Sequence, residues 1–213
     1  MTKKQTNEVA EDSKKSGLKI LAAADFHGDS DLAKKLSEKA KKNKVDLVLL
    51  LGDIHGPTVK SKGVIAPFKK NRQKVVFVPG NWDTSFETNM LESMYEAKDA
   101  SSHYVTYGDV GIVGVGSEDF QLELDEEKTF KKLKREFKKS KSKKKILISH
   151  LHAAGTKAEF SGFKGSKALR KAIKEFEPDL FLSAHIHEAE GIEEKVGKTK
   201  VINIGRKGRI IEI

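Results

Sequence analysis

The sequence contains no cysteine, few aromatic residues and no long apolar run. Without cysteine the chain can form no disulfide, thiolate zinc site or cysteine nucleophile, and we expect a reducing, cytoplasmic location. No apolar run approaches the ~18–20 residues that cross a membrane, and we expect no secretory signal in the polar first residues. These absences exclude a disulfide scaffold and predict no association with a membrane.

The positive charge is concentrated in one segment. The chain has 41 basic and 31 acidic residues, a formal net charge of +10. Residues 128–145 alone hold eleven Lys and Arg against one Glu, so basic and acidic residues balance in the rest of the chain. Phe130, Leu133 and Phe137 recur at helical spacing, which predicts a surface helix in the first half of this segment.

The pattern along the chain predicts a disordered tail over residues 1–16 and one α/β domain over residues 17–213. Five continuously apolar runs are typical of buried strands: LKILAAAD, VDLVLLLGD, KVVFVPGN, KKILISH and PDLFLSAH. Amphipathic stretches predict helices over residues 30–43, 86–97 and 166–176. We expect a hairpin at Gly108–Asp109 and two further turns, at Gly197–Lys198 and around 205–208. The first sheet should be mainly parallel, and the second half of the chain more antiparallel.

Polar side chains follow each of the five apolar runs where the predicted strand ends. They are Asp25 and His27, Asp53 and His55, Asn81 and Asp83, His150 and His152, and His185 and His187. Because ligands bind at the carboxyl edge of α/β sheets, we expect these groups to converge. Taken singly, each could be a helix cap, a turn or a surface residue. Five in succession indicate a site, and imidazole, carboxylate and carboxamide donors in this number suit two divalent transition metals.

In this order the blocks Asp-Phe-His, Gly-Asp-Ile-His, Gly-Asn-Trp-Asp, Ser-His-Leu-His and Ala-His-Ile-His resemble the calcineurin-like metallophosphoesterase superfamily. The small archaeal and bacterial phosphodiesterases of that superfamily are most similar, and the resemblance covers about residues 18–213. It implies a four-layer α/β/β/α sandwich of two mixed sheets flanked by helices, with a dinuclear metal site at one edge. It also implies Mn as the metal, with Fe, Zn, Ni or Co as alternatives.

The resemblance assigns seven ligands by motif. Asp25, His27 and His187 would hold the first ion, Asn81, His150 and His185 the second, and Asp53 would bridge them. A hydroxide shared by the two ions would then attack phosphorus in line, and neutral Asn81 would leave more positive charge for an anionic substrate. We therefore expect a metal-dependent phosphoric ester hydrolase that acts on small phosphate esters, preferably as a phosphodiesterase.

One position departs from the family pattern. Many members carry a histidine after the Asn of the third block, where it assists as an acid, and Trp82 stands there in this chain. An indole cannot deliver a proton at neutral pH, so His55 or His152 could substitute, or the leaving group could depart unaided. Trp82 itself could stack on a base or aromatic leaving group, or simply pack. Asp83 could orient a ligand or only shape a turn.

Two alternative functions remain open. A nuclease could use the same site with the basic segment 128–145 on nucleic acid, although a lysine run is more often a solvated helix face. A non-catalytic adaptor on the same fold would be favoured by lost ligands, whereas every ligand position here is filled. Substrate choice should depend on the loops near 58–68 and 155–165.

Overall fold

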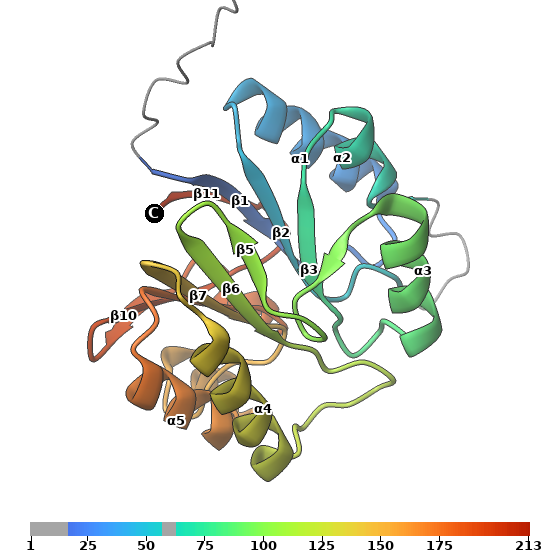
Figure 1. Ribbon diagram of the computed structural model, residues 1–213. Coiled ribbons are helices and arrows are strands. Elements are labelled where there is room, and N and C mark those ends of the chain that lie inside the picture. The colour runs from blue at the N-terminus through green and yellow to red at the C-terminus, as the bar shows by residue number, and fades with distance from the viewer. Residues whose placement is uncertain (1–16, 57–62) are drawn as a thin grey trace, which may run out of the picture.

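A computed structural model describes residues 17–56 and 63–213 (Figure 1). The strands are β1 (Lys19–Ala23), β2 (Leu47–Leu51), β3 (Val75–Val78), β4 (Lys98–Asp99), β5 (Val105–Tyr107), β6 (Val110–Val115), β7 (Lys144–Ser149), β8 (Leu180–Ser183), β9 (Glu193–Val196), β10 (Thr199–Asn203) and β11 (Arg209–Glu212). The helices are α1 (Ser30–Lys42), α2 (Ala66–Lys70), α3 (Ser85–Tyr95), α4 (Glu126–Lys139), α5 (Lys167–Phe176) and the 3-10 turns η1 (Lys157–Ser161) and η2 (His187–Ala189). The predicted tail, residues 1–16, and part of the 58–68 loop lie outside the described residues.

The strands form two mixed sheets. The first has the order β11-β1-β2-β3-β4, and the second has the order β5-β6-β7-β8-β10-β9. In the first sheet only the β1–β11 pair is antiparallel, whereas both edge pairs of the second sheet, β5–β6 and β9–β10, are antiparallel. The prediction of a mainly parallel first sheet and a more antiparallel second half is therefore confirmed.

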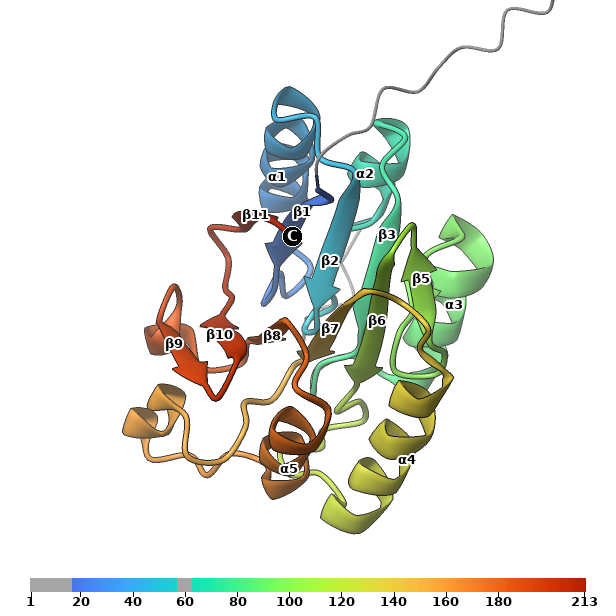
Figure 2. The ribbon, with the colours of Figure 1, turned by 60° about the vertical axis from the view of Figure 1, so that its left-hand side comes forward.

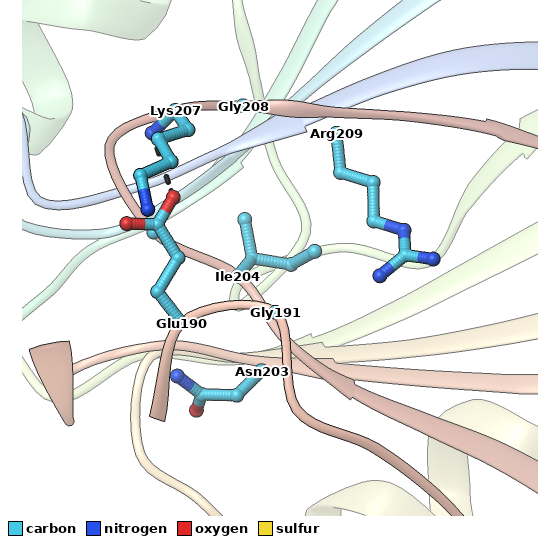
Figure 3. A pocket seen from close by; sticks show the side chains of 8 residues that line it. Glu190, Gly191, Asn203, Ile204, Lys207, Gly208 and Arg209 are labelled. Carbon is cyan, nitrogen blue, oxygen red and sulfur yellow. Dashed lines mark hydrogen bonds between the residues drawn. The ribbon is translucent and has the colours of Figure 1, made fainter. Parts of the chain in front are cut away.

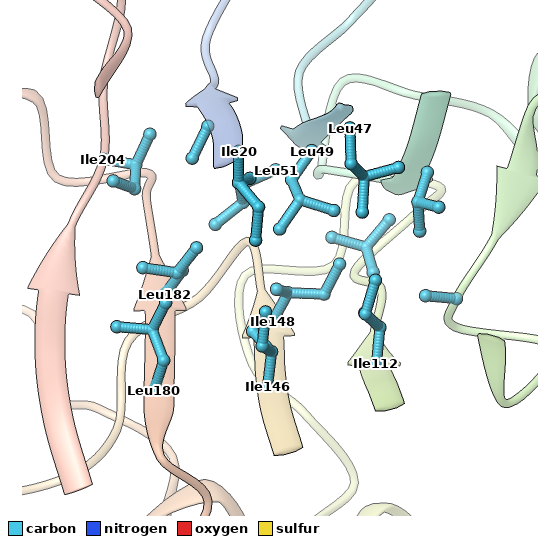
Figure 4. Close-up of a cluster of buried hydrophobic side chains, with 14 of the residues drawn as sticks. Ile20, Leu47, Leu49, Leu51, Ile112, Ile146, Ile148, Leu180, Leu182 and Ile204 are labelled. Atoms are coloured by element: carbon cyan, nitrogen blue, oxygen red, sulfur yellow. The ribbon is translucent and has the colours of Figure 1, made fainter. Parts of the chain in front are cut away.

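The two sheets face one another across the main core. Alternate residues of each strand point inward, such as Ile20 and Leu49 from the first sheet and Ile146 and Leu182 from the second (Figure 4). The residues between them on the same strands point outward and pack against the helices. Strands buried on both faces need continuous apolar runs, which explains why these segments lack polar alternation.

Helices cover the outer face of each sheet. Leu36 of α1 and Phe68 of α2 pack with Leu50 and Phe77 on the first sheet. Leu133 of α4 packs with Leu147 and Phe181 on the second sheet, where α4 and α5 lie side by side (Figure 2). The layers are thus helix, sheet, sheet and helix, and the predicted α/β/β/α sandwich is confirmed.

The last part of the chain does not stay in the second sheet. The hairpins at Gly108–Asp109 and Gly197–Lys198 join neighbouring strands of the second sheet, as expected. The turn at 205–208 instead carries the chain across the sandwich, so that β11 pairs with β1 in the first sheet. The short elements α2 and β4 were not predicted from the sequence pattern. None of the helices in residues 17–56 and 63–213 is long and apolar enough to cross a membrane.

Candidate metal centre

The carboxyl ends of strands from both sheets meet at one edge of the sandwich. Asp25 and Asp53 follow β1 and β2, Asn81 follows β3, and His150 and His185 follow β7 and β8. Parallel neighbours in register end at the same level, so these residues converge. All seven residues that the sequence predicts as ligands come together here.

The ligand atoms fall into two groups. Asp25, His27 and His187 form one group, and Asp53, His150 and His185 form the other, each with its atoms within 4.8 Å of one another. Asp53 reaches both, because its Oδ2 lies 3.4 Å from His150 Nε2 and 3.7 Å from His27 Nε2. This carboxylate therefore lies between the two groups.

Asn81 joins the second group. Its Oδ1 lies 3.1 Å from His150 Nε2, and its side chain is buried. The other ring nitrogen of His150, Nδ1, donates to the Leu51 carbonyl at 2.8 Å. This hydrogen bond directs Nε2 into the group, as a backbone partner commonly does for metal-binding histidines.

The donor set fits divalent cations. Asp25 Oδ1 is buried and has no hydrogen-bond partner, although His187 Nε2 lies 3.6 Å away. A buried carboxylate oxygen without a partner is costly unless a cation satisfies it. Nitrogen and oxygen donors without sulfur match the preference of Mn, Fe, Co, Ni and Zn. The residues of both groups therefore suit one cation each.

The pKa values of two histidines move in opposite directions. Burial alone would lower the pKa of His150, but the hydrogen bond and charge of Asp53, with the charge of Asp25, raise it to about 9. Burial, and next the positive charge of His150, lower the pKa of His185 to about 4. The metal-free site thus keeps one proton beside Asp53, where a cation would otherwise balance the carboxylates.

The backbone is strained where the ligands sit. Asp25, His27, Asp53 and His185 all have positive φ, between 46° and 67°. Residues other than glycine rarely adopt this left-handed conformation, and its cost is tolerated at functional sites that the surrounding structure holds in place. Glycine is required at position 80, because a Cβ there would lie 2.3 Å from Asp53 Oδ1.

Asp83 connects two of the ligand loops. Its Oδ2 accepts from the Gly80 and Ile54 N–H groups, and its Oδ1 accepts from the His55 N–H at 2.8 Å. The carboxylate is buried, so it fixes the Asp53 loop against the Asn81 loop. Of the two roles left open by the sequence, orientation of the ligand loops is the one that these contacts support.

The two additional histidines lie beside the groups but are engaged elsewhere. His55 Nδ1 contacts Asp83 Oδ1 at 3.0 Å, and although burial lowers its pKa, Asp83 raises it overall. His152 is buried, and its Nε2 donates to the Phe163 carbonyl at 3.2 Å. Burial lowers the pKa of His152, which leaves the ring neutral near pH 7.

Arg206 is a part of the centre that the sequence did not reveal. Its Nη1 donates to the Asp25 carbonyl at 2.6 Å, and its Nη2 donates to Asp29 Oδ2 at 2.7 Å. Asp29 caps the start of α1, so the guanidinium ties the first ligand loop to that helix. Arg206 lies in the turn between β10 and β11, far from Asp25 and Asp29 in the sequence. No local motif therefore indicates these contacts.

That turn also borders a separate cavity (Figure 3). Glu190 and Asn203 line it from the other side, and Glu190 Oε1 accepts from the Lys207 N–H at 2.7 Å. Its described lining residues include none of the seven predicted ligands, so this cavity is not the candidate site.

Fold and site together define a class: a two-sheet sandwich with paired histidine–carboxylate groups at one edge. The sequence model of the calcineurin-like phosphoesterases matches residues 18–189. The chain belongs to the calcineurin-like phosphoesterase family. This membership indicates a metal-dependent phosphoester hydrolase of a family that uses two metal ions, and the structure contains two groups of candidate metal ligands.

Solved structures show the same fold. The protein TT1561 of Thermus thermophilus is 19% identical, with a TM-score of 0.73 over 92% of this chain and 99% of that chain. A dimetal phosphatase from Danio rerio is 14% identical, with a TM-score of 0.63 over 90% and 88%. A purple acid phosphatase from Lupinus luteus is 12% identical, with a TM-score of 0.58 over 94% and 46%. No curated protein sequence matches this chain.

Proposed function

We propose that this chain hydrolyses small phosphodiesters with two divalent cations, Mn above the alternatives. The observation that carries the proposal is Asp53, whose Oδ2 faces a histidine of each group at 3.4 and 3.7 Å. Two bound cations would act as Lewis acids on the phosphoryl oxygens and would lower the pKa of an attacking water.

The chain's own residues set the charge of the site. Asp25 and Asp53 supply two negative charges, while Asn81 is neutral. Two divalent cations would therefore leave the centre positive, which favours an anionic phosphate ester. Arg206 and Asp83 do not bind the cations in this proposal; they hold the Asp25, Asp53 and Asn81 loops in place.

The site has no side chain well placed to protonate the leaving group. Trp82 occupies the position of the family's acid. The Nε2–H group of His152 donates its hydrogen bond to the Phe163 carbonyl and so does not face a leaving group. His55 directs Nδ1 at Asp83. We therefore propose a preference for esters whose leaving groups depart as stable anions, such as aryl diesters.

A small ester is favoured over a nucleic acid as substrate. Strand β7 runs from Lys144 to Ser149, so the last residue of the basic segment, Lys145, lies about 17 Å along the strand from His150. Several of its lysines also pair with acidic residues, including Lys143 with Asp109 and Lys144 with Asp179. These C-terminal lysines of the segment are poorly placed to hold a polymer across the centre.

Turnover of bis(4-nitrophenyl) phosphate and 4-nitrophenyl phosphate by the Mn-loaded protein tests this function. The proposal predicts faster turnover of the diester, and loss of turnover by at least 100-fold in Asp53→Asn. A matched variant, Asp109→Asn, changes an exposed carboxylate and should retain full activity. Absence of metal-dependent turnover, or full turnover by Asp53→Asn, would refute the proposal.

A further inference from the structure

Three exposed aromatic side chains surround the metal centre: Trp82, Phe120 and Phe163, called here the aromatic rim. They are 37%, 66% and 58% exposed. The Trp82 ring lies 6.3 Å from His27 and 5.9 Å from Phe120, measured between ring centroids. The Phe163 ring lies 6.1 Å from His185. Each candidate metal group therefore has an exposed aromatic ring against one of its histidines.

The rim is fixed to the same segments as the ligands. The Phe120 N–H donates to the Asn81 carbonyl at 2.9 Å, and the Asp119 N–H donates to the Asp83 carbonyl at 2.9 Å. Asp119 and Phe120 both have positive φ, 57° and 63°, which is rare for a bulky side chain and is tolerated where function requires it.

Phe163 is held in a comparable way. Its carbonyl accepts from His152 Nε2, and His152 lies two residues beyond the predicted ligand His150. Phe163 also belongs to the 155–165 loop, from which the sequence predicts a wall of the substrate site. The rim therefore stands on both sides of the centre on backbone that the ligand loops position.

A packing role does not explain the exposure. The structure buries other aromatic rings completely, among them Phe26, Phe77 and Phe181. Exposed aromatic surface gathered around a polar centre is typical of a surface that binds a ligand, with the polar groups fixing orientation. Aromatic rings recognise planar groups by stacking and edge-to-face contact.

We propose that the aromatic rim binds a planar aromatic substituent of the phosphate ester, which selects aryl or nucleoside diesters over alkyl diesters. This inference rests on the proposed phosphoesterase function of the same centre. Trp82, Phe120 and Phe163 are then specificity-determining residues, and the metal groups bind the phosphoryl oxygens.

Calorimetric titration of the Mn-loaded protein with non-hydrolysable phosphonates tests the rim. Phenylphosphonate should bind about tenfold more tightly than methylphosphonate. An adenine-bearing phosphonate distinguishes the two sources of a planar ring: tighter binding than phenyl assigns a nucleoside, and weaker binding assigns an aryl group. Trp82→Ala and Phe163→Ala should each reduce the phenyl preference to about twofold, and Trp82→Phe should restore it.

Phe86→Ala is the matched control. Phe86 is 72% exposed but lines a cavity beside α3 with Met90 and Met94, so its removal should leave the preference unchanged. Trp82 is the only tryptophan, so phenylphosphonate should quench the fluorescence of the unsubstituted protein and methylphosphonate should not.

The outcomes separate the two proposals. Equal binding of phenyl- and methylphosphonate, or a preference that persists in Trp82→Ala and Phe163→Ala, would overturn the rim and leave the phosphoesterase function standing. Absence of metal-dependent binding by either phosphonate, together with absence of turnover, would overturn the proposed function itself.

Discussion

Removal of the Asp83 carboxylate should damage both stability and the metal centre. The carboxylate accepts three backbone N–H groups, from Gly80, Ile54 and His55, and also contacts the His55 ring. These donors lie on the two loops that carry Asp53 and Asn81. In Asp83→Ala the three N–H groups lose their acceptor, and the loops lose the contact that holds them together.

The expected loss follows from the hydrogen bonds. An unsatisfied buried donor costs about 1–3 kcal/mol, so three of them, with partial access of water, should cost about 4 kcal/mol. This is a large part of the ~5–15 kcal/mol that stabilises a typical domain, yet it leaves the protein folded. Affinity for Mn should fall at least tenfold, because Asp53 and Asn81 are no longer held in register.

Urea unfolding and calorimetric Mn titration measure the two effects. Asp125→Ala provides the comparison, because Asp125 accepts from the Lys128 N–H as the exposed cap of α4. Its loss should lower stability less than the loss of Asp83 and should not affect Mn binding. If Asp83→Ala were no less stable than Asp125→Ala and bound Mn normally, the role assigned to Asp83 would be wrong.

Two further predictions concern the ligand loops. Gly80→Ala should weaken Mn binding at least tenfold, because the new Cβ would lie 2.3 Å from Asp53 Oδ1. Gly108→Ala is the control and should leave Mn affinity unchanged, because its Cβ would meet nothing within 4 Å. Equal Mn affinities of the two variants in a titration would contradict the steric argument. In the metal-free protein His150 has a pKa of about 9 when folded and 6.5 otherwise, so its stabilising contribution is complete below pH 6.5 and lost as the pH rises through 9. Urea unfolding should show this decline, of up to about 3 kcal/mol, and His150→Asn should remove it; the same slope in both proteins would exclude His150 as its source.

Much of the fold and the ligand set could be predicted because each feature is local in sequence. A strand buried on both faces must be continuously apolar, and the first polar residue after it must lie at the edge of the sheet. The order of Asp25, Asp53, Asn81, His150 and His185 along the chain therefore predicts their convergence without any knowledge of the contacts.

Features that depend on tertiary contact could not be predicted. Arg206 reaches the Asp25 loop only because β11 crosses to the first sheet, and no local pattern indicates that crossing. Phe120 and Phe163 lie in loops, where an exposed phenylalanine has no periodicity to mark it. The contacts of Asp83 were equally hidden, because an aspartate in a turn looks the same whether it accepts one N–H or three.

The number of ions bound per chain tests the central claim most directly. After dialysis against Mn, elemental analysis should find two ions in the unsubstituted protein and one in His187→Ala, which removes a ligand from the first group only. A single ion in the unsubstituted protein, or two tightly bound ions in His187→Ala, would contradict the two-group centre on which the proposed function depends.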